Sequence, residues 1–169
     1  ASDVYKRQTW ISTDQMIWYA HSQDHGESWG SPLMVSAPGI KETGFPTIFA
    51  GDSGRVVIGY IGEMNDVTAN NSTSGGVGWG GYMAIMTDAF NETPLITTVQ
   101  VNADSDPLDN ASPTCGYERC GGFGDFIDMH IDAFGRPWLA LSHNPKILFL
   151  CGLLFFVFCK IFAFYFYNF

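Results

Sequence analysis

The chain has 169 residues and a formal net charge of −9, from eight Lys and Arg against 17 Asp and Glu. This acidity argues against a nucleic-acid partner, because phosphate groups are held by an excess of Lys and Arg. The length fits about one domain of ordinary size.

The two ends of the chain differ in composition from its middle. Residues 1–8 (ASDVYKRQ) resemble a recurring non-native start of translated environmental sequences, so we expect the fold to occupy residues 9–145. Residues 146–169 form an abrupt apolar tail that holds eight of the fourteen Phe. This tail is either a non-native end or a membrane anchor, although its run of thirteen apolar residues at 147–159 is shorter than the roughly twenty that span a bilayer. In both cases we expect the tail to form a helix or lie loosely, and not to continue a sheet.

Short runs of β-branched, aromatic and other apolar residues, bounded by turn residues, predict strands along the whole middle region. The predicted strands are 16–21, 32–36, 45–50, 55–61, 82–87, 95–101, 125–131 and 137–142. The four strands from 45 to 101 make one complete antiparallel unit. The chain is therefore expected to be all-β.

The segments that join these strands are of two kinds. Consecutive connections of an antiparallel meander lie at opposite ends of the sheet. The short turns 51–54, 88–94 and 132–135 are therefore expected at one end, which we call the short-turn end. The long segments 36–44, 62–80 and 102–124 are expected at the other, which we call the long-segment end. Binding residues concentrate in long loops on a rigid scaffold, so we expect any ligand site at the long-segment end.

One turn, Ser22 to Trp29, follows the pattern S-x-D-x-G-x-S-W. Gly26 is expected to take a positive φ, and Asp24 to accept hydrogen bonds from the backbone N–H groups of the turn. Ser22 would close the hairpin from the other side, and Trp29 would fold back as an apolar plug between the strands. This pattern resembles the Asp box of the sialidase-like (BNR) β-propellers, in which such turns hold blades together away from the active site.

The resemblance implies a partial β-propeller with about two blades of four-stranded antiparallel sheet. A propeller has four to eight blades, so we expect the chain to be a fragment that is inactive alone. The implied function is carbohydrate-directed, as a glycoside hydrolase of the sialidase superfamily, in an extracellular or cell-surface protein. The alternative is a non-catalytic propeller that binds a glycan, a protein or a cation. A membrane-anchored surface protein is a third hypothesis, which requires the tail to be genuine.

A second pattern, G-D-[FY]…D-x-x-G-x-x-W, joins Gly124-Asp125-Phe126-Ile127-Asp128 to Asp132-Ala133-Phe134-Gly135-Arg136-Pro137-Trp138. It is similar to inner strands of many sialidase-like propellers, and this similarity places Asp125 at the long-segment end beside the central channel. Asp128 and His130 share one strand face. These three residues form either an acid–base or cation site, or a set of polar locks that satisfy backbone groups. We expect no metal site and no cofactor, with Ca²⁺ as the one cation that such carboxylates would suit.

Sialidases bind the substrate carboxylate with three Arg, and this chain offers one in a long segment, Arg119. They also use a Tyr/Glu nucleophile pair. Tyr60 and Glu63 lie near the long-segment end, and Glu63 is retained as a candidate catalytic residue. Trp79, between glycines, is either a platform for a sugar ring or a plug under its loop.

Cys115 and Cys120 form a C-x4-C pair in a glycine-rich segment. In an exported protein such a pair closes a small disulfide loop. The alternative is half of a zinc site, but no second Cys/His pair stands nearby at ligand spacing. The sequence therefore favours a disulfide.

Overall fold

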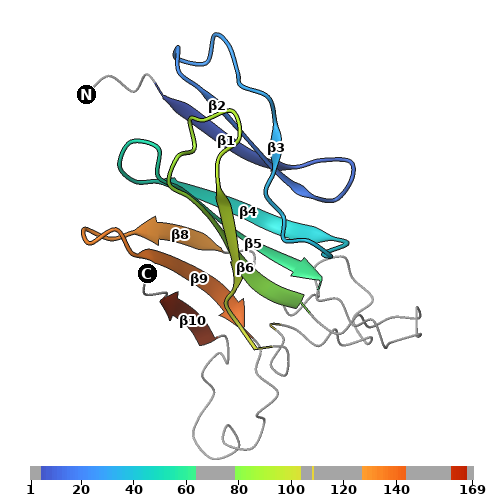
Figure 1. The fold of residues 1–169 in the computed structure, drawn as a ribbon. Coiled ribbons are helices and arrows are strands. Elements are labelled where there is room, and N and C mark those ends of the chain that lie inside the picture. Colours follow the sequence, from blue (N-terminus) through green and yellow to red (C-terminus); the bar gives the residue numbers. More distant parts are fainter. Residues whose placement is uncertain (1–4, 64–78, 104–107, 109–126, 144–160, 167–169) are drawn as a thin grey trace, which may run out of the picture.

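The computed structural model describes residues 5–63, 79–103, 108, 127–143 and 161–166. Within these residues every regular element is a β-strand, and the strands form three antiparallel sheets (Figure 1). The first sheet contains β1 (Lys6–Ile11), β2 (Ile17–Ser22) and β3 (Leu33–Met34). The central sheet contains β4 (Thr43–Ala50), β5 (Val56–Glu63), β6 (Trp79–Met86) and β7 (Ile96–Gln100). The third sheet contains β8 (Asp128–Ile131), β9 (Pro137–His143) and β10 (Ile161–Phe166).

The central sheet is buried on both of its faces. All residues of β5 are buried except the last, because the strand is an almost continuous apolar run. Val56, Ile58 and Tyr60 belong to a core shared with the first sheet. Val57 and Ile61 belong to a second core shared with the third sheet. Strand alternation thus sends successive residues of one strand into two different cores.

The predicted four-strand unit is confirmed as the central sheet, whose strands pair in chain order. The other predicted strands are also present, with boundaries shifted by a few residues; β3 is reduced to two residues. β8 begins at Asp128, and residues 125–126 of the predicted strand lie outside the described residues.

The N-terminal boundary of the fold lies earlier than expected. Lys6, Arg7 and Gln8 belong to β1 and pair with the end of β2, so strand pairing starts before residue 9. The side chain of Arg7 also lies over the rings of Tyr5 and Phe90, at 5.8 and 5.0 Å from their centroids. These contacts attach residues 5–8 to the loop after β6.

The expectation that the apolar tail does not continue a sheet is wrong for Ile161–Phe166. These residues form β10, which pairs antiparallel with β9 from Ile161 opposite His143 to Phe166 opposite Trp138. The physical reason is that β9 offers an open edge and that aromatic and β-branched residues favour strands. Among the described residues, no helix is long and apolar enough to cross a membrane.

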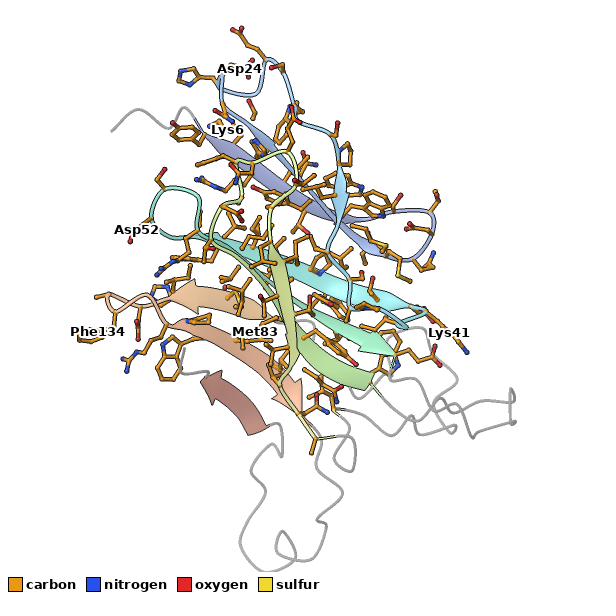
Figure 2. The ribbon with its side chains drawn as sticks, viewed as in Figure 1. Lys6, Asp24, Lys41, Asp52, Met83 and Phe134 are labelled. Atoms are coloured by element: carbon orange, nitrogen blue, oxygen red, sulfur yellow. The ribbon has the colours of Figure 1, made fainter. Side chains whose placement is uncertain are left out.

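The described connections lie at the expected ends of the sheets. At the short-turn end, the N–H of Ala89 donates to the carbonyl of Gly54 at 2.9 Å, and Arg55 Nη1 donates to the carbonyl of Gly135 at 3.4 Å. Figure 2 shows Asp52 and Phe134 on this side and Lys41 on the opposite side.

The turn between β1 and β2 was not predicted. Its position shows which strands of the central sheet correspond to those of the first sheet. Thr43 Oγ1 donates to the carbonyl of Gln15 at 2.6 Å, which places this turn at the long-segment end. β1 therefore runs in the same direction as β5, which also ends there. It follows that β1, β2 and β3 correspond to β5, β6 and β7, the second to fourth strands of the central sheet.

Candidate functional site

The turn between β2 and β3 is organised around the Asp24 carboxylate. Asp24 Oδ1 accepts from Ser22 Oγ at 2.6 Å and from the N–H of Ser28 at 2.9 Å, and Oδ2 accepts from Ser28 Oγ at 2.5 Å. Ser22 Oγ in turn accepts from the N–H of Gly26 at 2.8 Å, and Gly26 has a φ of 97°. The hydrogen bonds and the positive φ expected of this turn are confirmed.

These hydrogen bonds engage the Asp24 carboxylate within its own turn, so Asp24 stabilises the turn and does not bind a ligand. The bonds from the Ser22 and Ser28 side chains, with the Ser28 backbone bond, hold the pKa of Asp24 well below its usual range. The carboxylate faces its own turn and not an open pocket. The expectation for Trp29 is wrong, since it is 44% exposed and rests against Gly26 instead of filling a space between strands. The reason is that β3 has only two residues and offers little surface to cover the indole.

The turn between β8 and β9 has its own carboxylate at the centre. Asp132 Oδ1 accepts from the N–H groups of Phe134 and Arg136 at 2.9 and 3.0 Å. Asp132 Oδ2 accepts from Arg136 Nε at 2.6 Å and Trp138 Nε1 at 3.1 Å. Desolvation opposes ionisation of this group, but the four hydrogen bonds outweigh it and hold the pKa of Asp132 well below its usual range. This D-x-x-G-x-x-W segment is therefore another structural turn.

Asp128 and His130 do share one exposed face of β8, whereas Met129 and Ile131 are buried. Their surroundings differ, however. Asp128 Oδ1 accepts from the N–H of Met129 at 2.8 Å, as a local polar lock would. The His130 ring meets Phe49 edge-on at 4.7 Å between centroids and lies toward the short-turn end.

Tyr60 and Glu63 are not brought together as a nucleophile pair. Tyr60 is fully buried; its hydroxyl accepts from the N–H of Ala37 at 2.8 Å, and its ring stacks on Tyr82 at 5.4 Å. Burial raises the pKa of Tyr60, which keeps the phenol neutral. Glu63 is half-buried on the other face of β5, and its N–H donates to the carbonyl of Glu42 at 2.9 Å.

Trp79 is half-buried and packs against the core between the central and third sheets. Its carbonyl accepts from the N–H of Leu108 at 2.8 Å. This position matches the plug interpretation better than that of an exposed sugar platform, because much of the indole is already covered by protein.

Four of the predicted site residues lie outside the described residues: Arg119, Asp125, Cys115 and Cys120. Their proposed roles in ligand binding, catalysis and a disulfide stay predictions. In the part of the chain that is described, no group of three or more His, Cys, Asp or Glu side chains is placed to hold a metal ion.

Sequence reasoning missed a cavity at the short-turn end. It has a volume of about 490 Å³ and lies between the β4–β5 and β8–β9 turns, with Asp52, Arg55, His130 and Phe134 in its lining. An apolar cavity of about 280 Å³ adjoins it, and both are bordered by Arg55 and Gly135. Of this lining, the sequence analysis named only His130 as a candidate; a further signal was Gly51-Asp52-Ser53-Gly54-Arg55, a turn followed directly by one of the few Arg.

Comparison with known proteins found no family model, no curated protein and no solved structure that matches the chain.

Proposed function

We propose that this chain forms blades of a sialidase-like β-propeller in an extracellular or cell-surface protein, and that this protein hydrolyses glycans at the long-segment end. The observation that carries the proposal is the Asp24 turn. It joins β2 to β3, which correspond to the third and fourth strands of the central sheet, and an Asp box occupies the same place in a sialidase-like blade.

The packing of the sheets supports the same proposal. Blades of a propeller are four-stranded meanders stacked face to face around a channel. The central sheet is such a meander, and it packs on the first and third sheets through its two faces. The three sheets of the described residues are fewer than the four to eight blades of a closed propeller, so the proposal requires further blades.

The proposed chemistry is assigned to the long-segment end. Hydrolysis of a glycosidic bond generally uses a pair of carboxyl groups, whereas sialidases use a Tyr nucleophile with an Asp acid. Asp125 is proposed as one of them, with Asp128 and Glu63 as candidates for the second. Arg119 is proposed to bind an acidic sugar, because its guanidinium can hold a carboxylate by two parallel hydrogen bonds.

The second candidate function is glycan, protein or cation binding without catalysis. The position of Tyr60 favours it, since this residue is buried against Tyr82 and lies on the opposite face of β5 from Glu63. Tyr60 and Glu63 therefore do not form a Tyr/Glu nucleophile pair of the kind that sialidases use.

The two candidates are separated by assays of the full chain, extended by its neighbouring blades if it belongs to a longer protein. Fluorogenic α-sialosides and neutral β-glycosides serve as substrates, and a glycan array measures binding. The hydrolase hypothesis predicts turnover that is lost in Asp125→Asn and weakened in Arg119→Ala, with melting temperatures nearly unchanged and Asp88→Asn as the control. Binding without turnover supports the second candidate. Neither turnover nor binding contradicts both.

A further inference from the structure

The cavity at the short-turn end has the size and position of a small-ligand site. Its volume of about 490 Å³ lies within the range of about 300–1,000 Å³ that is usual for ligand pockets. Two turns from different sheets form its walls, and Asp52 and Phe134 mark it in Figure 2. Both turns are stiffened by internal backbone hydrogen bonds, of 2.9 Å from Arg55 N–H to the Asp52 carbonyl and 2.9 Å from Gly135 N–H to the Asp132 carbonyl.

Three polar side chains of the lining have hydrogen-bonding capacity left over. A guanidinium has five N–H donors, and Arg55 uses one of its groups, in the 3.4 Å bond to the Gly135 carbonyl. Among the described residues, the Asp52 carboxylate has neither a hydrogen bond nor an ion pair, and the His130 ring has only its edge contact with Phe49. The cavity therefore presents a strong donor, a strong acceptor and a group that serves as either.

The charges of the lining balance one another. Asp132 is paired with Arg136 at 2.6 Å and is saturated by its own turn, which leaves Arg55 as the cation and Asp52 as the anion among the described lining residues. A lone phosphate or carboxylate would gain from Arg55 but be repelled by Asp52. A neutral ligand with several hydroxyl groups can donate to Asp52 and accept from Arg55 at once.

An exposed aromatic ring stands beside these polar groups. Phe134 is 83% exposed, although the guanidinium of Arg136 lies 4.9 Å from its centroid. The face of an aromatic ring carries a negative quadrupole, which attracts the C–H groups of a sugar ring. An exposed ring next to unengaged donors and acceptors is the combination that a saccharide requires.

We propose that this cavity is a binding site for a neutral sugar unit, which Phe134 stacks on and which Arg55, Asp52 and His130 hold by hydrogen bonds. The site is separate from the one proposed for hydrolysis at the long-segment end, although Asp128, a candidate there, lies two residues before His130 on the same face of β8. Its occupancy does not depend on whether the long-segment end is catalytic.

The test is a titration of the full chain, followed by NMR, with glucose, galactose, mannose and N-acetylglucosamine, and separately with inorganic phosphate and acetate. At least one neutral sugar should shift resonances of the two turns in a saturable way. Arg55→Met should weaken this binding about tenfold or more, as expected for loss of hydrogen bonds from a charged donor. Phe134→Ala should weaken it about threefold or more. Lys41→Met, which removes a cation at the other end, should leave the affinity unchanged.

The proposal is overturned if no neutral sugar binds, if phosphate or acetate binds in place of sugars, or if both variants retain the affinity of the parent. Phe134 is almost fully exposed, so its replacement keeps the test decisive even if Arg55→Met fails to fold. The resonance shifts of the two turns are read independently of turnover at the long-segment end, which distinguishes failure of this site from failure of the proposed hydrolase.

Discussion

The central sheet packs on its two neighbours by different means. Against the first sheet it presents Tyr60 and Tyr82, which belong to the same core as Tyr19, and we call this contact the tyrosine interface. Against the third sheet it presents two glycines, Gly59 and Gly81, and we call this contact the glycine interface. A Cβ added to Gly59 would lie 2.5 Å from Leu139 Cδ1, and one added to Gly81 would overlap Leu141 Cδ1.

The difference shows two solutions to one problem, the burial of both faces of a sheet. In the tyrosine interface large rings fill the space, and each hydroxyl needs a partner because a buried polar group without one is destabilising. The Tyr60 hydroxyl accepts a hydrogen bond from the N–H of Ala37 at 2.8 Å, and the Tyr19 hydroxyl donates one to the carbonyl of Ala89 at 3.5 Å. In the glycine interface the backbone itself is the surface, so the leucines of β9 approach it closely.

The largest effect is expected in the glycine interface, from Gly81→Ala. The new methyl group would overlap Leu141 and lie 2.8 Å from Val101 Cγ2, so it should lower the free energy of unfolding by about 1–3 kcal/mol through overpacking. Urea denaturation of both proteins measures the change. Gly30→Ala is the control, since its methyl group would lie 3.4 Å from the His21 ring at an exposed position. An unchanged midpoint for Gly81→Ala would mean that the third sheet does not pack there.

A smaller effect is expected in the tyrosine interface, from Tyr60→Phe. The ring is retained, but the N–H of Ala37 loses its acceptor, at a cost of about 1–2 kcal/mol in unfolding free energy. Tyr19→Phe is the matched variant and should cost less, because its hydrogen bond is long. Burial raises the pKa of Tyr19 to about 12, so neither phenol ionises during a comparison at neutral pH. Equal losses in the two variants would contradict the distinction between a short and a long hydrogen bond.

The smallest effect is expected outside both interfaces, at the exposed Asp24 turn, and it depends on pH. The pKa of Asp24 is depressed in the folded state, so its stabilising contribution is present above the unfolded value of about 3.9 and is lost as the pH falls further. Asp24→Asn should therefore be less stable than the parent at neutral pH, and the two should converge in acid. Melting temperatures of both proteins from pH 7 to pH 2 test this. A constant difference at every pH would rule out the ionised carboxylate as the source.

The sequence was informative where a local pattern determines the structure. The central sheet, its turns and the hydrogen bonds of Asp24 follow from strand alternation and from the S-x-D-x-G-x-S spacing. β1 and β10 were not predicted, because the composition of residues 1–8 and 146–169 differs from that of the middle of the chain. Pairing with an open strand edge requires only backbone groups and a suitable length, and composition does not exclude it.

The candidate site was less predictable, because it depends on how sheets stack. Tyr60 and Glu63 are close in sequence, but only burial shows that Tyr60 belongs to a core. The cavity beside Arg55 joins turns about 80 residues apart, and no local pattern reports such a contact. The alternation of connections in a meander predicted at which end of a sheet each connection lies. It did not predict that the turns at the short-turn end border a cavity.

The packing of the central sheet between two others is the claim on which the proposed blades depend. Nuclear Overhauser effects in methyl-labelled full chain test it most directly. The structure predicts cross-peaks between the Leu141 methyl groups and the Gly81 α protons, and between the Tyr19 ring and Ala89, in the same sample. Absence of either set, with the pairing of β4 to β7 intact, would contradict the stacked arrangement.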